Sequence, residues 1–152
     1  MAWDVVEQKL ESLRRCLRRV EEKCPPDVET LARDVDAQDI LSLNLSRAVQ
    51  LCVDIGAHLI SATETPAPTT MGETFDILAS AGLISADLAE KMKQAVGFRN
   101  LTVHNYAAVN WTIVYAIARH HLDDFKAFAQ TVMREMDGHL VASRAYQKKN
   151  ER

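Results

Sequence analysis

The sequence predicts an all-α protein, an up-and-down helical bundle of four to five helices. Apolar residues recur at steps of three and four along several long segments, which is the spacing of an amphipathic helix. No segment alternates apolar and polar residues between turn residues, as a half-buried strand would. With 152 residues, of which 47% are hydrophobic and 26% charged, the chain has the balance of one globular domain. We expect a single helical domain over 1–138 and a polar C-terminal tail over 139–152.

The first helix is expected over 2–23. Its apolar side chains form one stripe, made by Val6, Leu10, Leu13, Leu17 and Val20. Pro25 and Pro26 end this helix, because proline lacks the backbone N–H group and disfavours helix in the residue before it.

A second, longer helix is expected over 40–60, with a start signal at Asp36 and Asp39. Its apolar residues cover nearly the whole circumference. Such a helix must be central in the bundle, or lie between its own domain and a partner.

Turn and capping residues divide the next part of the chain. Pro66 and Pro68 mark a loop over 63–70. Thr70 and Glu73 have the spacing of a capping box and predict the start of a short helix, which Gly82 ends.

Two further helices complete the predicted bundle. Ser85 is expected to cap a helix that runs to about Phe98 or a few residues beyond. A last long helix carries Trp111 and is expected to end near Gly138. The residues after it are polar and basic, and we expect them to fray.

Composition limits the possible classes of protein. Three cysteines without paired spacing predict neither a disulfide framework nor a zinc site. No window approaches 18 uninterrupted apolar residues, and the N-terminus has no signal peptide pattern, so we expect a soluble, cytoplasmic protein. The net charge of −3 argues against indiscriminate binding of nucleic acid, although it allows a local basic patch.

Residues 97–106 bring together a cation, an imidazole, amides and a phenol, and they are the candidate functional segment. Its chemical groups are Arg99, Asn100, His104 and Tyr106. Residues five apart on an ideal helix are separated by about 140° of rotation, so Arg99 and His104 do not share a face of one unbroken helix. A break or turn near 103–107 would bring them together, or a second subunit would.

This set of groups suits cleavage of RNA by its own 2′-hydroxyl. That reaction needs a proton taken from the hydroxyl, a proton given to the leaving oxygen, and stabilisation of charge on the phosphate. His104 transfers protons near neutral pH, and Arg99 offers a planar fork of donors to phosphate oxygens. Tyr106 is a candidate to orient the histidine or to donate to the phosphate.

The spacing of Arg99, His104 and Tyr106, introduced by Gly-Phe-Arg-Asn, resembles the signature of HepT-like proteins of the HEPN superfamily. The runs from Gln38 to His58 and from Glu73 to Ile84 are also similar to that family. The resemblance covers roughly residues 40–128 and is fairly specific when motif, flanks and helix order are taken together.

The resemblance implies a homodimer, with two motifs close together in a metal-independent ribonuclease site that needs no cofactor. It also implies a partner, a minimal (MNT) nucleotidyltransferase that acts as antitoxin in a type VII-like toxin–antitoxin pair. In characterised members that enzyme adds AMP to the motif tyrosine, and the matching residue here is Tyr106. Bulk and negative charge at this position would block an incoming phosphate.

Three features leave alternatives open. Gln50, Asp54 and His58 form a polar stripe at steps of four, interpreted as hydrogen-bonded or dimer-contact groups, with support of the catalytic pair by Asp54 as the alternative. Asp54 and His58 lack a third ligand, so no metal site is expected.

The first helix carries a basic face, whose members are Arg14, Arg15, Arg18 and Arg19. We interpret this face as solvated surface, with RNA backbone binding or antitoxin docking as alternatives. For the protein as a whole, the alternative to a ribonuclease is a non-catalytic helical dimer that binds a nucleotide or a protein.

Overall fold

A computed structural model describes residues 3–150, without the side chains of residues 140–144 and 146. The described residues form seven α-helices and one 3-10 helix, with no strand, which confirms the all-α class. In chain order the elements are α1 (Trp3–Lys23), α2 (Val28–Leu31), α3 (Val35–Ser61), α4 (Met71–Ser80), α5 (Ala86–His104), η1 (Tyr106–Ala108), α6 (Trp111–His120) and α7 (Leu122–Asn150).

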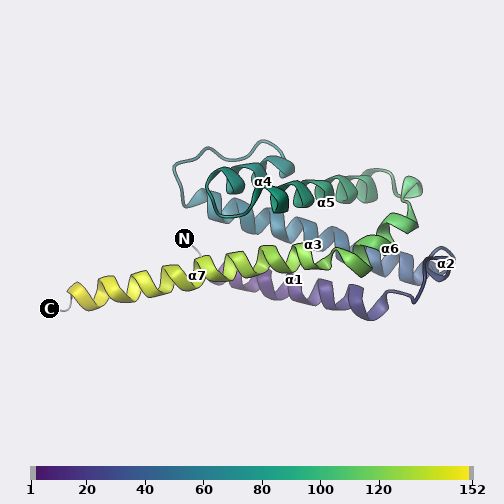
Figure 1. Cartoon of the computed structure of the whole chain (residues 1–152), viewed down its shortest axis with the longest axis horizontal. Coiled ribbons are helices and arrows are strands. Elements are labelled where there is room, and N and C mark those ends of the chain that lie inside the picture. Colours follow the sequence, from purple (N-terminus) through teal and green to yellow (C-terminus); the bar gives the residue numbers. More distant parts are fainter. Residues whose placement is uncertain (1–2, 151–152) are drawn as a thin grey trace.

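Helix α3 is the centre of the bundle. It packs against α1 on one side and against α4 and α5 on the other, as Figure 1 shows. By length and composition α3 would pass for a membrane-spanning helix, but 56% of its most apolar window is buried inside the protein. Much of its apolar surface therefore lies in the core, and the central position in the bundle, one of the two expected alternatives, is confirmed.

Two aromatic side chains join α4 to α7, and one glycine lets α3 and α4 pack closely. Phe75 of α4 and Phe128 of α7 are both fully buried, and their rings meet edge to face with centroids 5.7 Å apart. Gly56 of α3 lets α4 approach closely, because a Cβ atom there would lie 2.6 Å from Cγ2 of Thr74. These contacts hold the C-terminal half of α3 between α4 and α7.

Several helix ends have the chemistry that their residues predict. The backbone N–H of Glu73 donates to Oγ1 of Thr70 at 3.1 Å, and that of Leu88 donates to Oγ of Ser85 at 3.1 Å. Gly82 has φ +78°, the left-handed conformation expected after α4. The Glu73 carboxylate accepts from the hydroxyl and the backbone N–H of Thr69, which lower the pKa of Glu73, and a weaker backbone hydrogen bond from Thr70 lowers it further.

The start of α3 differs from the sequence expectation. The helix begins at Val35, and its N-cap is Asp34, whose carboxylate accepts from the N–H of Ala37 at 3.1 Å. Asp36 lies in the first turn, where a negative charge stabilises the N-terminal end of the helix dipole. The short helix α2 between α1 and α3 was not predicted.

The expected single last helix is wrong, since it is divided into α6 and α7 at His121. Asp123 and Asp124 stand in the first turn of α7, where acidic residues favour a new N-terminus. The expected end near Gly138 is also wrong, because α7 continues to Asn150. A glycine inside a helix costs only about 1 kcal/mol relative to alanine, and good helix formers follow it.

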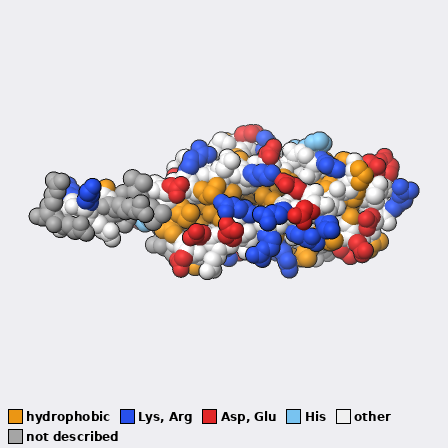
Figure 2. Space-filling model, turned by 90° about the horizontal axis from the view of Figure 1, so that it is seen from below, with side chains coloured by type: hydrophobic (Ala, Val, Ile, Leu, Met, Phe, Trp, Pro, Cys, Tyr) orange, Lys and Arg blue, Asp and Glu red, His pale blue; other side chains and the backbone are white. Residues whose placement is uncertain are grey.

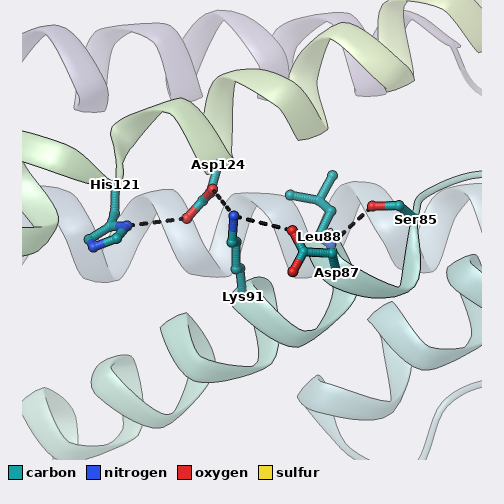
Figure 3. A network of polar contacts seen from close by, with 6 residues as sticks. All are labelled: Ser85, Asp87, Leu88, Lys91, His121 and Asp124. Atoms are coloured by element: carbon teal, nitrogen blue, oxygen red, sulfur yellow. Dashed lines mark hydrogen bonds and ion pairs between the residues drawn. The ribbon is translucent and has the colours of Figure 1, made fainter.

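A charged cluster connects α5 to the start of α7 (Figure 3). Nζ of Lys91 lies 3.2 Å from Oδ2 of Asp87 and 3.9 Å from Oδ1 of Asp124. Nδ1 of His121 lies 3.8 Å from the other Asp124 oxygen. The hydrogen bond and charge of Asp87, together with Asp124, raise the pKa of Lys91. The cluster links α5, the helix that carries the candidate motif, to the start of α7.

Candidate functional site

Helix α5 carries both charged residues of the motif. It is a regular helix from Ala86 to His104, so Arg99 and His104 point about 140° apart around its axis. A break does occur within 103–107, at Asn105, where φ is −150° and ψ is 69°. This break comes after His104, so it does not turn the histidine toward the arginine. Within one protomer the two side chains therefore stay on different faces.

The half-buried Arg99 is held by its neighbour in the chain. Nη1 of Arg99 donates to Oδ1 of Asn100 at 3.2 Å. His104 is exposed at the last position of the helix. The guanidinium is therefore oriented while the imidazole is open to a ligand.

Tyr106 lies in the 3-10 helix η1, just beyond the break. Its hydroxyl donates to Oδ1 of Asp39 on α3 at 2.8 Å, and its ring meets Trp111 edge to face at 5.8 Å between centroids. Partial burial and the Asp39 carboxylate raise the pKa of Tyr106, so the phenol is protonated at neutral pH. The side chain is still 41% exposed and remains accessible to a partner.

Asp39 is the site residue that sequence reasoning missed. It was interpreted only as a helix-start signal, and it lies 67 positions from Tyr106 in the chain. No spacing rule connects residues so far apart in the chain. The available signal was that Asp39 is an acidic residue in the otherwise mostly apolar helix α3.

Asp54 makes its contacts elsewhere. Its carboxylate accepts from Nε2 of Gln50 at 2.9 Å and lies 3.5 Å from Nζ of Lys9 on α1. Asp54 is also about 22 Å along α3 from Asp39, at 1.5 Å of rise per residue. The hydrogen bond between Gln50 and Asp54 confirms that these two residues of the polar stripe are hydrogen-bonded to each other. Among the described residues, no hydrogen bond or ion pair joins Asp54 to the motif.

Apolar surface surrounds the end of α5. The buried stripe of Ala89, Met92 and Val96 continues in helical spacing to Asn100 and Val103, yet Val103 is 53% exposed. Other exposed apolar side chains belong to the elements that meet at this end of the bundle in Figure 1; they are Val35, Leu101 and Ile113. Exposed apolar surface of this kind is typical of an interaction site.

The part of the chain that the structure describes contains no group of three or more His, Cys, Asp or Glu side chains arranged to hold a metal ion. The groups available for chemistry at the end of α5 are a guanidinium, an imidazole and a phenol. They are suited to proton transfer and to binding an anion.

Comparisons with known proteins find similar sequences among ribonucleases. Residues 13–132 match the model of the ribonuclease HepT-like family. The mRNA nuclease HepT of Shewanella oneidensis is 32% identical over 132 residues, which cover 87% of this chain and 98% of that protein.

Solved structures extend the similarity to the fold. The tri-AMPylated Shewanella oneidensis HEPN toxin in complex with the MNT antitoxin is 31% identical, with a TM-score of 0.81 over 86% of this chain and 98% of that one. A toxin–antitoxin crystal structure with AMP-PNP has the same TM-score and coverage at 30% identity. The Bacillus subtilis cytosolic protein YutE, of unknown function, shares the fold at 14% identity and a TM-score of 0.79. On the family match over residues 13–132 and the identity to a nuclease along most of its length, the chain belongs to the ribonuclease HepT-like family.

Proposed function

We propose that this protein is an endoribonuclease toxin that cleaves RNA without a metal ion, through Arg99 and His104. The observation that carries the proposal is the end of α5, where an oriented guanidinium and an exposed imidazole occur in a chain related to an mRNA nuclease. The proposed reaction uses no cofactor. Since its substrate is RNA, we propose that the protein acts in the cytoplasm.

In the proposed reaction the 2′-hydroxyl oxygen of one nucleotide attacks the adjacent phosphorus. The bond from phosphorus to the 5′-oxygen breaks, leaving a 2′,3′-cyclic phosphate and a 5′-hydroxyl end. His104 transfers protons to and from the reacting oxygens, and Arg99 stabilises the charge that develops on the phosphate. Asn100 positions the guanidinium through its hydrogen bond.

The proposed active unit is a homodimer. Arg99 and His104 diverge by about 140° on α5, so one protomer does not direct both at the same phosphate. A second copy packed against this end of the bundle would place the arginine of one protomer near the histidine of the other. It would also cover the exposed Val103 and Ile113.

The test of this function is cleavage of single-stranded RNA by protein purified without its partner, in buffer containing EDTA. We expect products with 2′,3′-cyclic phosphate ends, identified by mass spectrometry or by their resistance to phosphatase until dilute acid has opened the cyclic diester. Tight binding of RNA or nucleotide without any product would contradict the proposal and favour a non-catalytic binding protein.

We further propose a nucleotidyltransferase antitoxin as partner, with Tyr106 as the residue that it modifies. The support is the 41% exposure of Tyr106 and the AMPylated state of the related toxin. Added phosphate brings bulk and negative charge, which would repel an RNA phosphate near Arg99.

Mass spectrometry of the protein co-expressed with such a partner is expected to find one or more AMP units on the peptide that contains Tyr106. Tyr106→Phe, which keeps the ring, is expected to prevent the modification. The same AMP content in Tyr106→Phe would mean that another residue is the acceptor.

A further inference from the structure

A groove of about 640 Å³ lies between α1 and α3, outside the candidate motif. Three guanidinium groups line it, from Arg15 and Arg19 on α1 and from Arg47 on α3, and no carboxylate does. Figure 2 looks onto the side of the bundle that contains α1 and shows Lys and Arg side chains across its middle, with Asp and Glu side chains among them. A protein with a net charge of −3 thus carries a concentrated basic site.

The positive charges of the groove are largely available to a ligand. Among the described residues, Arg15 and Arg47 form no ion pair, and Arg19 has only a long contact of 3.7 Å with Glu22. Burial raises the pKa of the Cys16 thiol, and the positive charges of Arg47 and Arg15 both oppose that effect. The two guanidinium groups are therefore both close enough to Cys16, which lines the groove, to influence its charge. An anion in the groove would therefore meet two or three cations at once.

The groove and the contact of Asp39 with Tyr106 lie on the same helix, α3. Asp39, Leu43 and Arg47 follow one another at steps of four, and each step turns the side chain by about 40° around the helix axis. Asp39 holds the hydroxyl of Tyr106, and Arg47 lies about 12 Å further along the helix at 1.5 Å per residue. Leu43, which is 50% exposed, lies between them and offers an apolar surface to a base.

We propose that this groove binds the backbone phosphates of single-stranded RNA on one side of the scissile bond, with Arg15 and Arg47 as phosphate ligands. This proposal rests on the proposed ribonuclease function. Unpaired guanidiniums beside an apolar floor match a strand whose phosphates and unstacked bases are both accessible. An acidic polypeptide would satisfy the charges but would give no role to the exposed apolar side chain of Leu43, on which a base can stack.

The test measures binding of a fluorescent RNA oligonucleotide with 2′-O-methyl riboses. The methyl group removes the attacking hydroxyl, so binding is measured without cleavage. Fluorescence anisotropy over a range of salt concentrations gives the slope of log K against log salt. Since each phosphate contact to a single strand contributes about 0.7 to that slope, Arg15→Gln/Arg47→Gln is expected to reduce its magnitude by about 1.4.

Matched variants control for charge and folding. Arg134→Gln, at an exposed arginine of α7 that is outside the groove, is expected to leave the slope unchanged. Arg15→Lys/Arg47→Lys keeps both charges and is expected to restore most of the slope. Circular dichroism of each variant confirms that the helical fold is retained.

Four results would overturn the groove assignment. The first is a slope in the glutamine variant equal to that of the wild type, and the second is no binding of RNA by the wild type. The third is normal RNA binding by the glutamine variant with loss of the antitoxin complex, and the fourth is a change of its oligomeric state in light scattering. Either of the last two would make the groove a protein interface. If the wild type binds through the groove but cuts no unmodified RNA, the proposed function fails and the groove assignment stands.

Discussion

Replacing His104 with alanine is expected to slow RNA cleavage by roughly 10² to 10⁴-fold, the usual contribution of a positioned acid–base group. His104 is exposed at the last position of α5, so its loss leaves no cavity in the core. Cleavage rates at saturating RNA, with protein of equal helical content, measure the effect. His120→Ala removes another exposed histidine, on α6, and is expected to cut at the wild-type rate.

Arg99→Ala is expected to lower the rate by about 10² to 10³-fold, since it removes a donor to the developing charge. Cleavage by folded Arg99→Ala and His104→Ala proteins at the wild-type rate would reject the site assignment.

A mixture of these two inactive variants distinguishes a shared site from a site within one protomer. If the arginine of one copy acts with the histidine of the other, random mixing into dimers restores about a quarter of the wild-type activity, because half of the dimers carry one complete site. Mixed dimers without activity would argue against the shared site.

The largest effect on stability is expected from Phe128→Ala, at about 3 to 5 kcal/mol of unfolding free energy. Phe128 is fully buried, and its ring packs edge to face against Phe75. Removing the ring loses apolar burial and leaves a cavity where α4 and α7 meet.

Urea denaturation followed by circular dichroism measures the loss, at one protein concentration because the proposed dimerisation would also add to stability. Gln130→Ala, at an exposed position of the same helix, is expected to change the free energy of unfolding by less than about 0.5 kcal/mol. A loss of less than about 1 kcal/mol in Phe128→Ala would show that the ring is not tightly packed.

Local chemistry explains which parts of the fold were predictable. Thr70 and Ser85 cap their helices through hydrogen bonds to residues three positions ahead, and Gly82 takes the left-handed conformation that a helix end favours. Such interactions involve near neighbours in the chain. Helix geometry likewise predicted that Arg99 and His104 diverge on one unbroken helix, but the helix was expected to end about Phe98 or a few residues beyond, and it reaches His104.

Sequence alone therefore determined the helical class, several helix ends, the central α3 and the residues of the candidate motif. The tertiary structure decided the contact of Tyr106 with Asp39, the pairing of Asp54 with Lys9, the division between α6 and α7, and the groove that joins Arg15 to Arg47. The reason is physical: a cap or a helical stripe depends on residues within a turn or two. A contact between distant segments exists only after the whole bundle has packed, and no spacing in the chain encodes it.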